Sequence, residues 1–228
     1  MNRIEREGLT GVIKKPWGWE YRVWESDLCS LWFLHLEQGQ QTSMHCHPTK
    51  TAGFVLLKGE AEFCFLNETT LMRAPDKRMV RRGLFHRQRA LSEGGVWFLE
   101  IETPVDKRDL IRLSDEYGRE AKGYEDGTQT ISEVNRISIR EPEPGGGIGY
   151  IMEGAQFYVQ RRNDMAFLND KNPDDIIVFL RGGLGKVVDG VRRNATVPGD
   201  IGTVKIIRRV AENMDYLEDD TLFIVVPG

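Results

Sequence analysis

The stretch SMHCHPTKTAGFVLLKG, residues 43–59, places two histidines just before an apolar run that is typical of a buried strand. Successive side chains of a strand point to opposite faces, so residues two apart share a face. The imidazoles of His45 and His47 are therefore expected to converge on one point. Because residues 48–59 contain neither Asp nor Glu, a metal ion at that point would find no carboxylate in the strand that follows.

All four histidines of the chain lie in its first half, so any imidazole chemistry belongs to that half. His86 follows in RRGLFHRQRAL, where a glycine precedes another expected strand. Three imidazoles that meet from two strands form a common site for Zn, Fe, Ni, Cu or Mn. His35 is expected to be an ordinary surface or core histidine, and Cys46 points to the opposite face from its neighbours. The predicted metal ligands are thus His45, His47 and His86.

The composition is that of an ordinary globular protein. The chain has 228 residues, of which 40% are hydrophobic and 29% charged, and a net charge of −4, which does not favour a nucleic-acid-binding or disordered protein. No apolar run is long enough to cross a bilayer, and the start MNRIEREGL lacks a secretion signal, so we expect a cytoplasmic protein. Three cysteines at irregular spacing argue against a disulfide framework.

Short segments rich in β-branched and aromatic residues recur along the chain and are separated by Gly, Pro, Asn and Asp. This pattern predicts an all-β sandwich or barrel with almost no helix. The expected strands are SLWFLHL, GFVLLKGEAEFCFL, GVWFLEIE, NRISIRE, QFYVQRR, DIIVFLRG, GKVVDG and TLFIVVPG.

The polar stretch REAKGYEDGTQT, residues 119–130, is the expected linker between two units. FVLLKGEAEF in the first half and IIVFLRGGLGKVV in the second both run strand, glycine, strand. A tight turn favours a residue that tolerates positive φ, so each segment is expected to be a hairpin turned at its glycine. A duplicated β-barrel, with domains at residues 1–122 and 123–228, explains this repeat.

The histidine spacing resembles the two motifs of the cupin family, G-x5-H-x-H-x(3,4)-E-x6-G and P-x-G-x2-H. The matching residues are Gly39, His45, His47, Gly59, Gly83 and His86. KPWGWE, residues 15–20, and ETPVDKRDLIRLSDEYGRE, residues 102–120, are similar to the opening and closing elements of the phosphomannose isomerase-like branch, which also forms the isomerase part of type II mannose-6-phosphate isomerases.

This resemblance implies an all-β fold of two cupin-type barrels in tandem, each a double-stranded β-helix or jelly roll. The first barrel would bind the metal. The second has no histidine and is expected to be degenerate and metal-free, with a structural role. Because exposed edges of such sheets often pair, a homodimer is expected by analogy with the fold.

The chain departs from the motif at Ala52, seven residues before Gly59, where the family places its carboxylate ligand. The side chains that could still complete the shell are Gln41, Glu62 and Glu100. The resemblance otherwise implies one divalent transition metal, Zn, Mn, Ni or Fe, held by three neutral imidazoles. Such a site keeps open positions and a positive charge that favours an anionic ligand.

Basic residues fit an anionic ligand. Arg and Lys crowd residues 73–89, Arg119 closes the YGR element, and Lys50 stands two residues before Ala52. The resemblance implies an isomerase-like activity on a sugar phosphate or nucleotide sugar, and its motif singles out Arg119 as a catalytic residue. Lys50 is the second expected catalytic residue, because its position lets it face the pocket as a phosphate contact or a base. Trp17, in the PWG turn, is expected to be a pocket wall. Aldose–ketose isomerisation needs a base and a Lewis acid, and the missing carboxylate argues against assigning that reaction outright.

Two other functions stay open on the sequence. One is a non-catalytic bicupin that binds metal and a sugar acid or similar anion, as a sensor or accessory protein. The other is a three-histidine metal dioxygenase, which iron with oxygen uptake would indicate. The sequence therefore leaves open whether the chain is an enzyme. It predicts a small anionic, carbohydrate-like ligand and no nucleic-acid or membrane partner.

Overall fold

The computed structural model describes residues 11–120 and 136–228. Within these ranges the chain forms two compact units. Residues 11–76, 80–120 and 136–138 belong to the first unit, and residues 77–79 and 139–228 to the second. The expected boundary between residues 122 and 123 lies outside the described residues, as does most of the expected linker.

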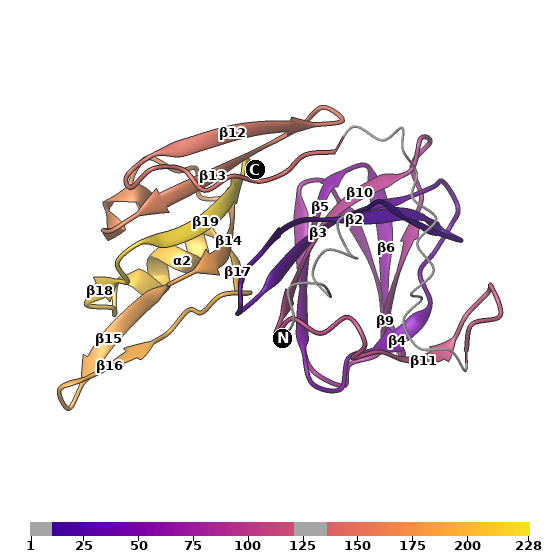
Figure 1. Ribbon diagram of the computed structural model, residues 1–228, viewed down its shortest axis with the longest axis horizontal. Coiled ribbons are helices and arrows are strands. Elements are labelled where there is room, and N and C mark those ends of the chain that lie inside the picture. The colour runs from indigo at the N-terminus through magenta and orange to yellow at the C-terminus, as the bar shows by residue number, and fades with distance from the viewer. Residues whose placement is uncertain (1–10, 121–135) are drawn as a thin grey trace. The chain divides into compact units, whose positions relative to one another are not determined.

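The first unit is built from two sheets. Its strands are β1 (Ile13–Lys15), β2 (Gly18–Glu25), β3 (Ser30–Leu36), β4 (Met44–Cys46), β5 (Thr51–Lys58), β6 (Glu60–Phe65), β7 (Thr69–Arg73), β8 (Asp76–Val80), β9 (His86–Ala90), β10 (Val96–Thr103) and β11 (Ile111–Ser114). One sheet has the order β1-β2-β3-β10-β5-β8 and the other β11-β4-β9-β6-β7. In Figure 1, β3, β5 and β10 lie on one side of this barrel and β4, β6 and β9 on the other. The facing four-strand sets β3-β10-β5-β8 and β4-β9-β6-β7 give the strand order of a jelly roll.

The core of this barrel lies between its two sheets. Trp32, Phe54, Phe63 and Phe98 are each at most 1% exposed and pack in one cluster. They alternate along their strands with residues of the opposite face, as period-2 patterning requires. Each such side chain contributes about 1.5–3 kcal/mol by leaving water. The predicted strand SLWFLHL forms β3 with the same bounds.

Gly59 and Gly182 turn the chain from one sheet into another, so the predicted hairpins are wrong. Gly59 joins β5, in the six-stranded sheet, to β6, in the five-stranded sheet. Both glycines have positive φ, 88° and 68°, which is the conformation that the sequence pattern indicated. The pattern gives the need for a sharp turn, but it does not say whether the two strands pair or lie on facing sheets.

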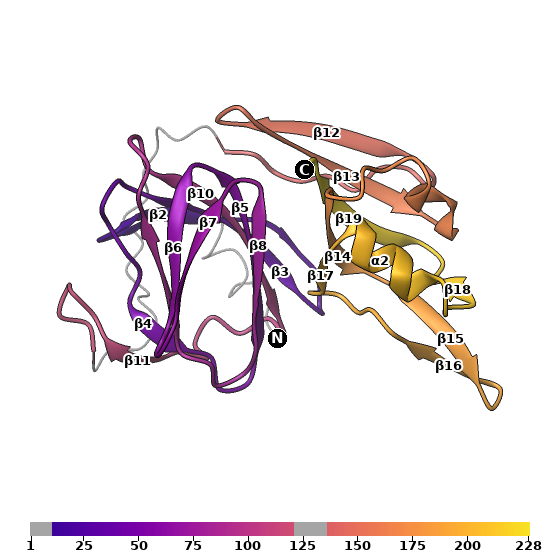
Figure 2. The ribbon, with the colours of Figure 1, turned by 180° about the vertical axis from the view of Figure 1, so that it is seen from behind.

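The second unit also contains two sheets. Its elements are β12 (Gly147–Met152), β13 (Ala155–Arg162), the 3₁₀ helix η1 (Met165–Leu168), β14 (Ile176–Arg181), β15 (Leu184–Val188), β16 (Val191–Asn194), β17 (Ile201–Thr203), α2 (Val204–Ala211), β18 (Tyr216–Leu217) and β19 (Thr221–Val226). The sheets have the orders β12-β13-β19-β14-β17 and β16-β15-β18. Figure 2 shows α2 beside β14, where its apolar face joins a core around Phe179 and Phe223.

The second barrel lacks the strand that carries the histidine pair in the first. Its order β13-β19-β14-β17 repeats β3-β10-β5-β8, and β18-β15-β16 repeats β9-β6-β7. No strand of the described residues corresponds to β4, because the chain between β13 and β14 contains η1 instead. The predicted fold, two cupin-type barrels of which the second is degenerate, is therefore confirmed.

Two further local predictions failed. The segment NRISIRE was expected to be a strand, but residues 136–141 form none. No helix was expected where VKIIRRVA forms α2. Its buried residues Val204 and Ile207 are three apart, which suits a helix face, but eight residues give too short a period-3.6 signal. No helix of the described residues is long and apolar enough to span a membrane.

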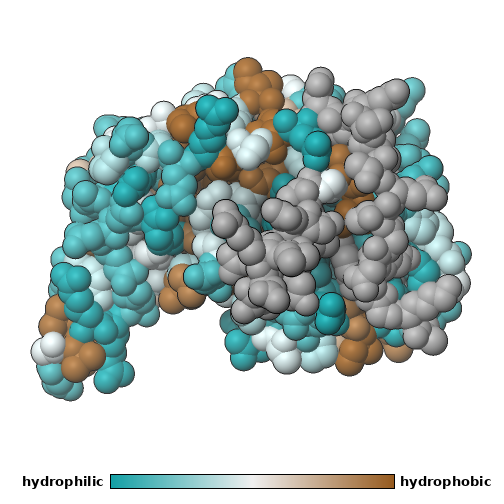
Figure 3. Space-filling view, in the orientation of Figure 1, coloured by the Kyte–Doolittle hydropathy of each residue, from teal (hydrophilic) through white to brown (hydrophobic). Residues whose placement is uncertain are grey.

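The β15–β16 hairpin exposes aliphatic side chains. Val187, Val188 and Val191 are 45%, 38% and 56% exposed, and Figure 3 shows hydrophobic atoms at the tip of this hairpin. Asp189 and Gly190 connect the strands with φ of 52° and 75°, the two positive angles that a two-residue hairpin turn requires.

Substitution of the corner glycine should destabilise the first barrel. A Cβ at Gly59 would lie 3.0–3.1 Å from Ser92 Oγ, Val96 Cγ1 and the Gly95 carbonyl. Gly39 has φ of 76° but no atom within 4 Å of such a Cβ, so G39A is a matched control for backbone strain alone. We expect urea unfolding to show a loss of about 1–2 kcal/mol for G39A. For G59A the loss should be about 1–3 kcal/mol larger. Equal losses would contradict the crowding.

Candidate metal centre and ligand pocket

Three imidazoles meet where β4 and β9 pair in the first barrel. His45 in β4 pairs directly with His86 in β9, and their ring centroids are 4.4 Å apart. His47, one residue beyond β4, places its ring centroid 5.0 Å from that of His45 and 5.4 Å from that of His86. Each residue offers a ring nitrogen within 4.8 Å of the other two. The structure thus brings together the three predicted ligands.

Backbone carbonyls fix the tautomer of each ring. The Nδ1 atoms of His45, His47 and His86 lie 2.8, 2.6 and 3.0 Å from the carbonyl oxygens of Ser43, Asp109 and Leu84. A carbonyl can only accept a hydrogen bond, so each Nδ1 carries the proton and each Nε2 keeps its lone pair. The Nε2 atoms of His47 and His86 are buried and have no hydrogen-bond partner within residues 11–120 and 136–228. This is the donor arrangement that a transition metal requires.

The histidine cluster is electrically neutral near pH 7. Burial lowers the pKa of His45 well below its usual range, and the neighbouring imidazoles lower it further. Burial also lowers the pKa of His47 to about 4 and that of His86 to about 3, with Lys50 and His47 respectively as the next causes. Neutral imidazoles are the metal-binding form, so no proton has to leave before a metal binds at neutral pH.

Asp109 holds the histidine loop at two points. Its carbonyl accepts the Nδ1 proton of His47, and its carboxylate accepts the backbone N–H groups of Thr49 and Lys50 at 2.9 and 2.8 Å. These hydrogen bonds outweigh its burial and lower the pKa of the Asp109 carboxyl. Asp109 therefore orients His47 without contacting a ligand itself.

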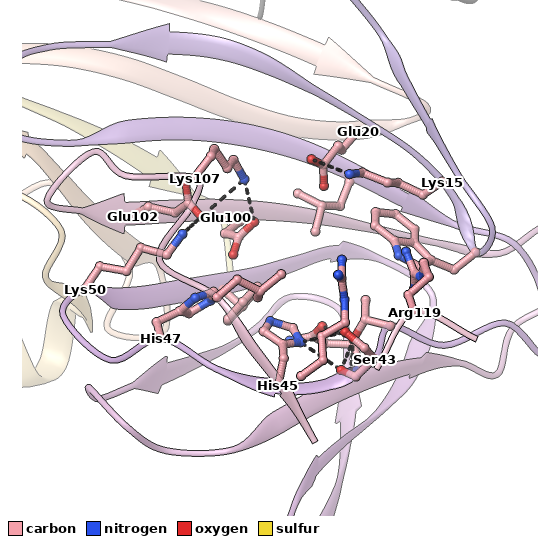
Figure 4. Close-up of a pocket in the computed structure, with 17 residues that line it drawn as sticks. Lys15, Glu20, Ser43, His45, His47, Lys50, Glu100, Glu102, Lys107 and Arg119 are labelled. Atoms are coloured by element: carbon pink, nitrogen blue, oxygen red, sulfur yellow. Dashed lines mark hydrogen bonds and ion pairs between the residues drawn. The ribbon is translucent and has the colours of Figure 1, made fainter. Parts of the chain in front are cut away.

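A pocket of about 540 Å³, part of it open to solvent, lies against the histidines. It is lined by Lys15, Trp17, Glu20, Leu34, Thr42, Ser43, His45, His47, Lys50, Phe54, Gln88, Glu100, Glu102, Lys107, Leu110, Arg112 and Arg119. Trp17 is the aromatic wall that the sequence predicted. Figure 4 shows His45 and His47 on one side of this space, near Lys50 and the acids of β10.

Two carboxylates of the pocket, Glu100 and Glu102, come from β10. Glu102 pairs directly with Ala52 across β10 and β5, and Glu100 pairs with Phe54. Residues directly opposite in an antiparallel pair share a face, so both acids point into the barrel where position 52 offers only a methyl group. Glu100 and Glu102 also lie within 4.8 Å of a ring nitrogen of His47. Of the three proposed substitutes for the missing acid, Glu100 reaches this pocket.

Gln41 and Glu62 do not line the pocket. Glu62 lies 3.7 Å from Arg89 in an exposed ion pair. His35 lies away from the cluster between Trp19 and Trp97, with ring centroids 5.3 and 4.7 Å away, as its ordinary role predicted.

Lys50 belongs to a buried ion-pair network. Its Nζ donates to Glu102 Oε1 at 2.6 Å and to the Asp106 carbonyl at 3.0 Å. Lys107 Nζ lies 3.2 Å from Glu102 and 3.8 Å from Glu100, and 3.9 Å from the ring centre of Trp32. A second pair joins Lys15 to Glu20 at 3.7 Å. Every lysine of the pocket is therefore already matched by a carboxylate.

The two acids of β10 have opposite pKa shifts. Burial raises the pKa of Glu100 to about 7, although Lys107 opposes it. Burial would also raise the pKa of Glu102, but Lys107 and Lys50 together lower it to about 2. Glu102 is thus the permanently charged partner of the lysines, whereas Glu100 holds its charge less firmly.

Arg119 lines the pocket but is bound to Asp115. Its Nε and Nη2 donate to the two carboxylate oxygens of Asp115 at 3.0 and 2.6 Å. Its guanidinium also lies 5.1 Å from the ring centre of Tyr117. None of the basic side chains of residues 73–89 lines the pocket, and Arg73 among them pairs with Glu60 on the surface. Arg112, which pairs with His45 across β11 and β4, does line the pocket.

Sequence reasoning missed Lys107, Glu102, Asp109 and Gln88. Two acids spaced by two in the otherwise apolar strand VWFLEIE signal a polar patch on a buried face, and Glu102 could have been found in this way. Gln88 follows His86 by two residues in β9 and so shares its face. Asp109 and Lys107 lie in an irregular segment, where no periodicity shows which way a side chain points.

No protein-family model matches the chain, and no curated protein matches it. Similar solved structures include an uncharacterized conserved protein with a double-stranded β-helix domain from Klebsiella pneumoniae, 20% identical over 42% of this chain and 84% of that one, with a TM-score of 0.39. KdgF from a Halomonas species is 15% identical over 40% and 84% of the two chains, with a TM-score of 0.39. The capsular polysaccharide assembling protein CapF from Staphylococcus aureus is 16% identical over 46% and 34%, with a TM-score of 0.41.

The first unit has the strand order of a jelly roll, which is the architecture of cupin-type barrels. The histidine cluster lies at the junction of β4 and β9, inside that barrel. The fold alone does not select a reaction.

Metal binding should depend on the histidine cluster. We expect the purified protein to bind about one divalent transition metal ion per chain. H45A/H86A should abolish this metal content, because it removes two of three nitrogen ligands. Elemental analysis of protein purified without a metal-affinity tag measures it, and H35A is the matched control. Full metal content in the double variant would exclude the site.

The buried Lys50–Glu102 pair should contribute more to the free energy of unfolding than an exposed ion pair does. K50M leaves Glu102 buried with one cation fewer, and we expect a loss of about 3–5 kcal/mol in urea unfolding of metal-free protein at pH 7. R73M, which breaks an exposed pair, is the control and should cost less than about 1 kcal/mol. Because the pKa of Glu102 falls from 4.5 to about 2, its stabilisation is present above pH 4.5 and is lost as the pH falls toward 2. Equal losses of unfolding free energy for K50M and R73M would contradict a larger stabilisation by the buried pair.

Proposed function

We propose that the first unit is a metal-dependent cupin that holds one divalent transition metal through His45, His47 and His86 and binds a small anionic, carbohydrate-like ligand beside it. The observation that carries this proposal is the shared tautomer of the three rings, which leaves each Nε2 lone pair available next to the pocket. The ligand would be a sugar phosphate, a nucleotide sugar or a sugar acid. A bound metal would supply a Lewis acid that polarises a ligand oxygen.

The charges of the pocket support an anionic ligand. The three imidazoles are neutral, so they do not reduce the charge of a divalent cation. The lysines of the pocket and the acids of β10 and β2 balance one another, so a bound metal ion and the Arg112 guanidinium would give the pocket a positive charge. Trp17 offers an apolar ring against which a sugar could pack.

An isomerase-like reaction would need a base other than Lys50. The Nζ of Lys50 donates hydrogen bonds to Glu102 Oε1 and to the Asp106 carbonyl, so it is already engaged as a donor. Glu100 is a carboxyl of the pocket that forms only the longer 3.8 Å pair with Lys107, so it is the better placed acceptor of a substrate proton. On this proposal Lys50 positions Glu102 and Arg119 positions the YGR turn.

A non-catalytic binding role is the second candidate. Both residues predicted to be catalytic form ion pairs within the protein, Lys50 with Glu102 and Arg119 with Asp115, and this favours a binding role. A sensor or accessory protein would need the metal and the pocket, but no base. The two candidates therefore differ in Glu100 and agree on the histidines.

Ligand linkage tests the proposal. Metal-loaded protein is heated with mannose 6-phosphate, GDP-mannose or glucuronate, and a ligand that binds the folded state should raise Tm by several degrees at saturating concentration. H45A/H86A is the control and should lose the shift. If the protein converts a ligand that shifts Tm, and E100Q abolishes that conversion, the isomerase-like function is supported. A Tm shift without conversion would support the binding role. A metal-loaded protein that responds to none of these ligands would contradict the proposal, and iron with oxygen uptake would support a dioxygenase.

A further inference from the structure

Gln88 is a buried polar side chain of the pocket that the proposed function has not used. It follows His86 by two residues in β9, so both side chains point to the same face of the strand. Gln88 is 1% exposed and lines the pocket. Its Nε2 is buried and has no hydrogen-bond partner among the described residues. A buried N–H donor without an acceptor is unfavourable, and an acceptor on a ligand would relieve it.

Thr42 fixes which end of the Gln88 amide faces the ligand space. Thr42 Oγ1 accepts the backbone N–H of Gln88 at 3.1 Å and lies 3.0 Å from Gln88 Oε1. A hydroxyl has a single proton, and its best acceptor here is Oε1, since the Ser43 carbonyl is farther away at 3.4 Å. The backbone N–H of Thr42 also donates to the Gln88 carbonyl at 2.9 Å. The amide oxygen therefore faces Thr42, and the NH₂ group is left for the pocket.

The remaining polar groups of the pocket narrow the ligand class. The lysines are matched by carboxylates, and Arg119 is engaged in a two-point contact with Asp115. The one other cation that lines the pocket in the described part of the chain is the guanidinium of Arg112. A phosphate, with three terminal oxygens, is best bound by several uncommitted cations or donors. A carboxylate needs only two contacts, one for each oxygen.

We propose that Gln88 is a specificity residue that donates a hydrogen bond from Nε2 to one oxygen of a ligand carboxylate whose other oxygen binds the metal held by the three histidines. This inference rests on the proposed function for the metal, and it narrows the ligand from small anions in general to carboxylates such as sugar acids. Thr42 is the positioning residue that holds the amide in the donating orientation.

Cobalt-loaded protein provides a readout that needs no knowledge of the reaction. The visible absorption of bound Co²⁺ changes when an anion enters its coordination shell, so the Kd of acetate, chloride and inorganic phosphate can be measured directly. Acetate offers a second oxygen beside the metal-bound one, whereas chloride has no second atom. We expect Q88L and Q88M to raise the Kd of acetate about tenfold, and to change that of chloride less than about twofold. T42V should raise the Kd of acetate by a smaller factor.

Controls separate binding from folding. Q41L replaces another buried glutamine of the same barrel that does not line the pocket, and it should leave all three Kd values unchanged. Cobalt content and Tm are measured for every variant, and Q88M, which keeps the length of the side chain, carries the test if Q88L does not fold.

Each outcome has a distinct meaning. If the wild-type protein binds cobalt but no anion alters its spectrum, the proposed function fails. If acetate binds but the Gln88 variants leave its Kd unchanged, the role of Gln88 is overturned. The same follows if the variants raise the Kd of chloride as much as that of acetate. If phosphate binds more tightly than acetate and depends more on Gln88, the carboxylate class is overturned.

Discussion

The pairing of His45 with His86 across β4 and β9 is the contact on which the candidate site depends. Two residues that face each other across an antiparallel pair share one side of the sheet, and here this geometry brings two imidazoles to a centroid distance of 4.4 Å. His47 joins them because it lies two residues beyond His45. The strand order of the jelly roll is what makes β4 and β9 neighbours, although some 40 residues separate them in the chain. The fold therefore assembles the candidate metal centre from two histidines that are close in sequence, His45 and His47, and a distant one, His86.

The pairing of β5 with β10 also places acids opposite Ala52, the position at which the cupin motif has a carboxylate. Ala52 pairs with Glu102, and Phe54, the next residue of β5 on the same face, pairs with Glu100. The carboxylates at this wall are therefore supplied by β10. These acids are shared with Lys50 and Lys107, and the result is a pocket wall that is polar but nearly neutral. Single charges at such depth would be costly, and they persist because each has a partner. A wall of this kind leaves the electrostatics of the pocket to a metal ion.

How much the sequence revealed follows from periodicity. The strands β3, β5, β6 and β10 and the convergence of His45 and His47 follow from spacing along short segments. The strands β1, β2, β7, β8 and β11 were not predicted. Positive φ at Gly59 was also predictable, but not that it joins facing sheets. The partners of Lys50 and Arg119 were not predictable, because they depend on the tertiary positions of Glu102 and on the turn around Asp115. Their roles as predicted catalytic residues stay predictions.

Asp109 gives the site a mechanical property. A single residue orients His47 through its carbonyl and anchors the backbone of Thr49 and Lys50 through its carboxylate, and the chain then continues into β11, which pairs with β4. Displacing this segment would release the ring of His47 and loosen the lysine of the buried ion pair at the same moment. The histidine cluster and the ion-pair network are therefore held in place by the same residue, so a local opening of this segment would disturb both.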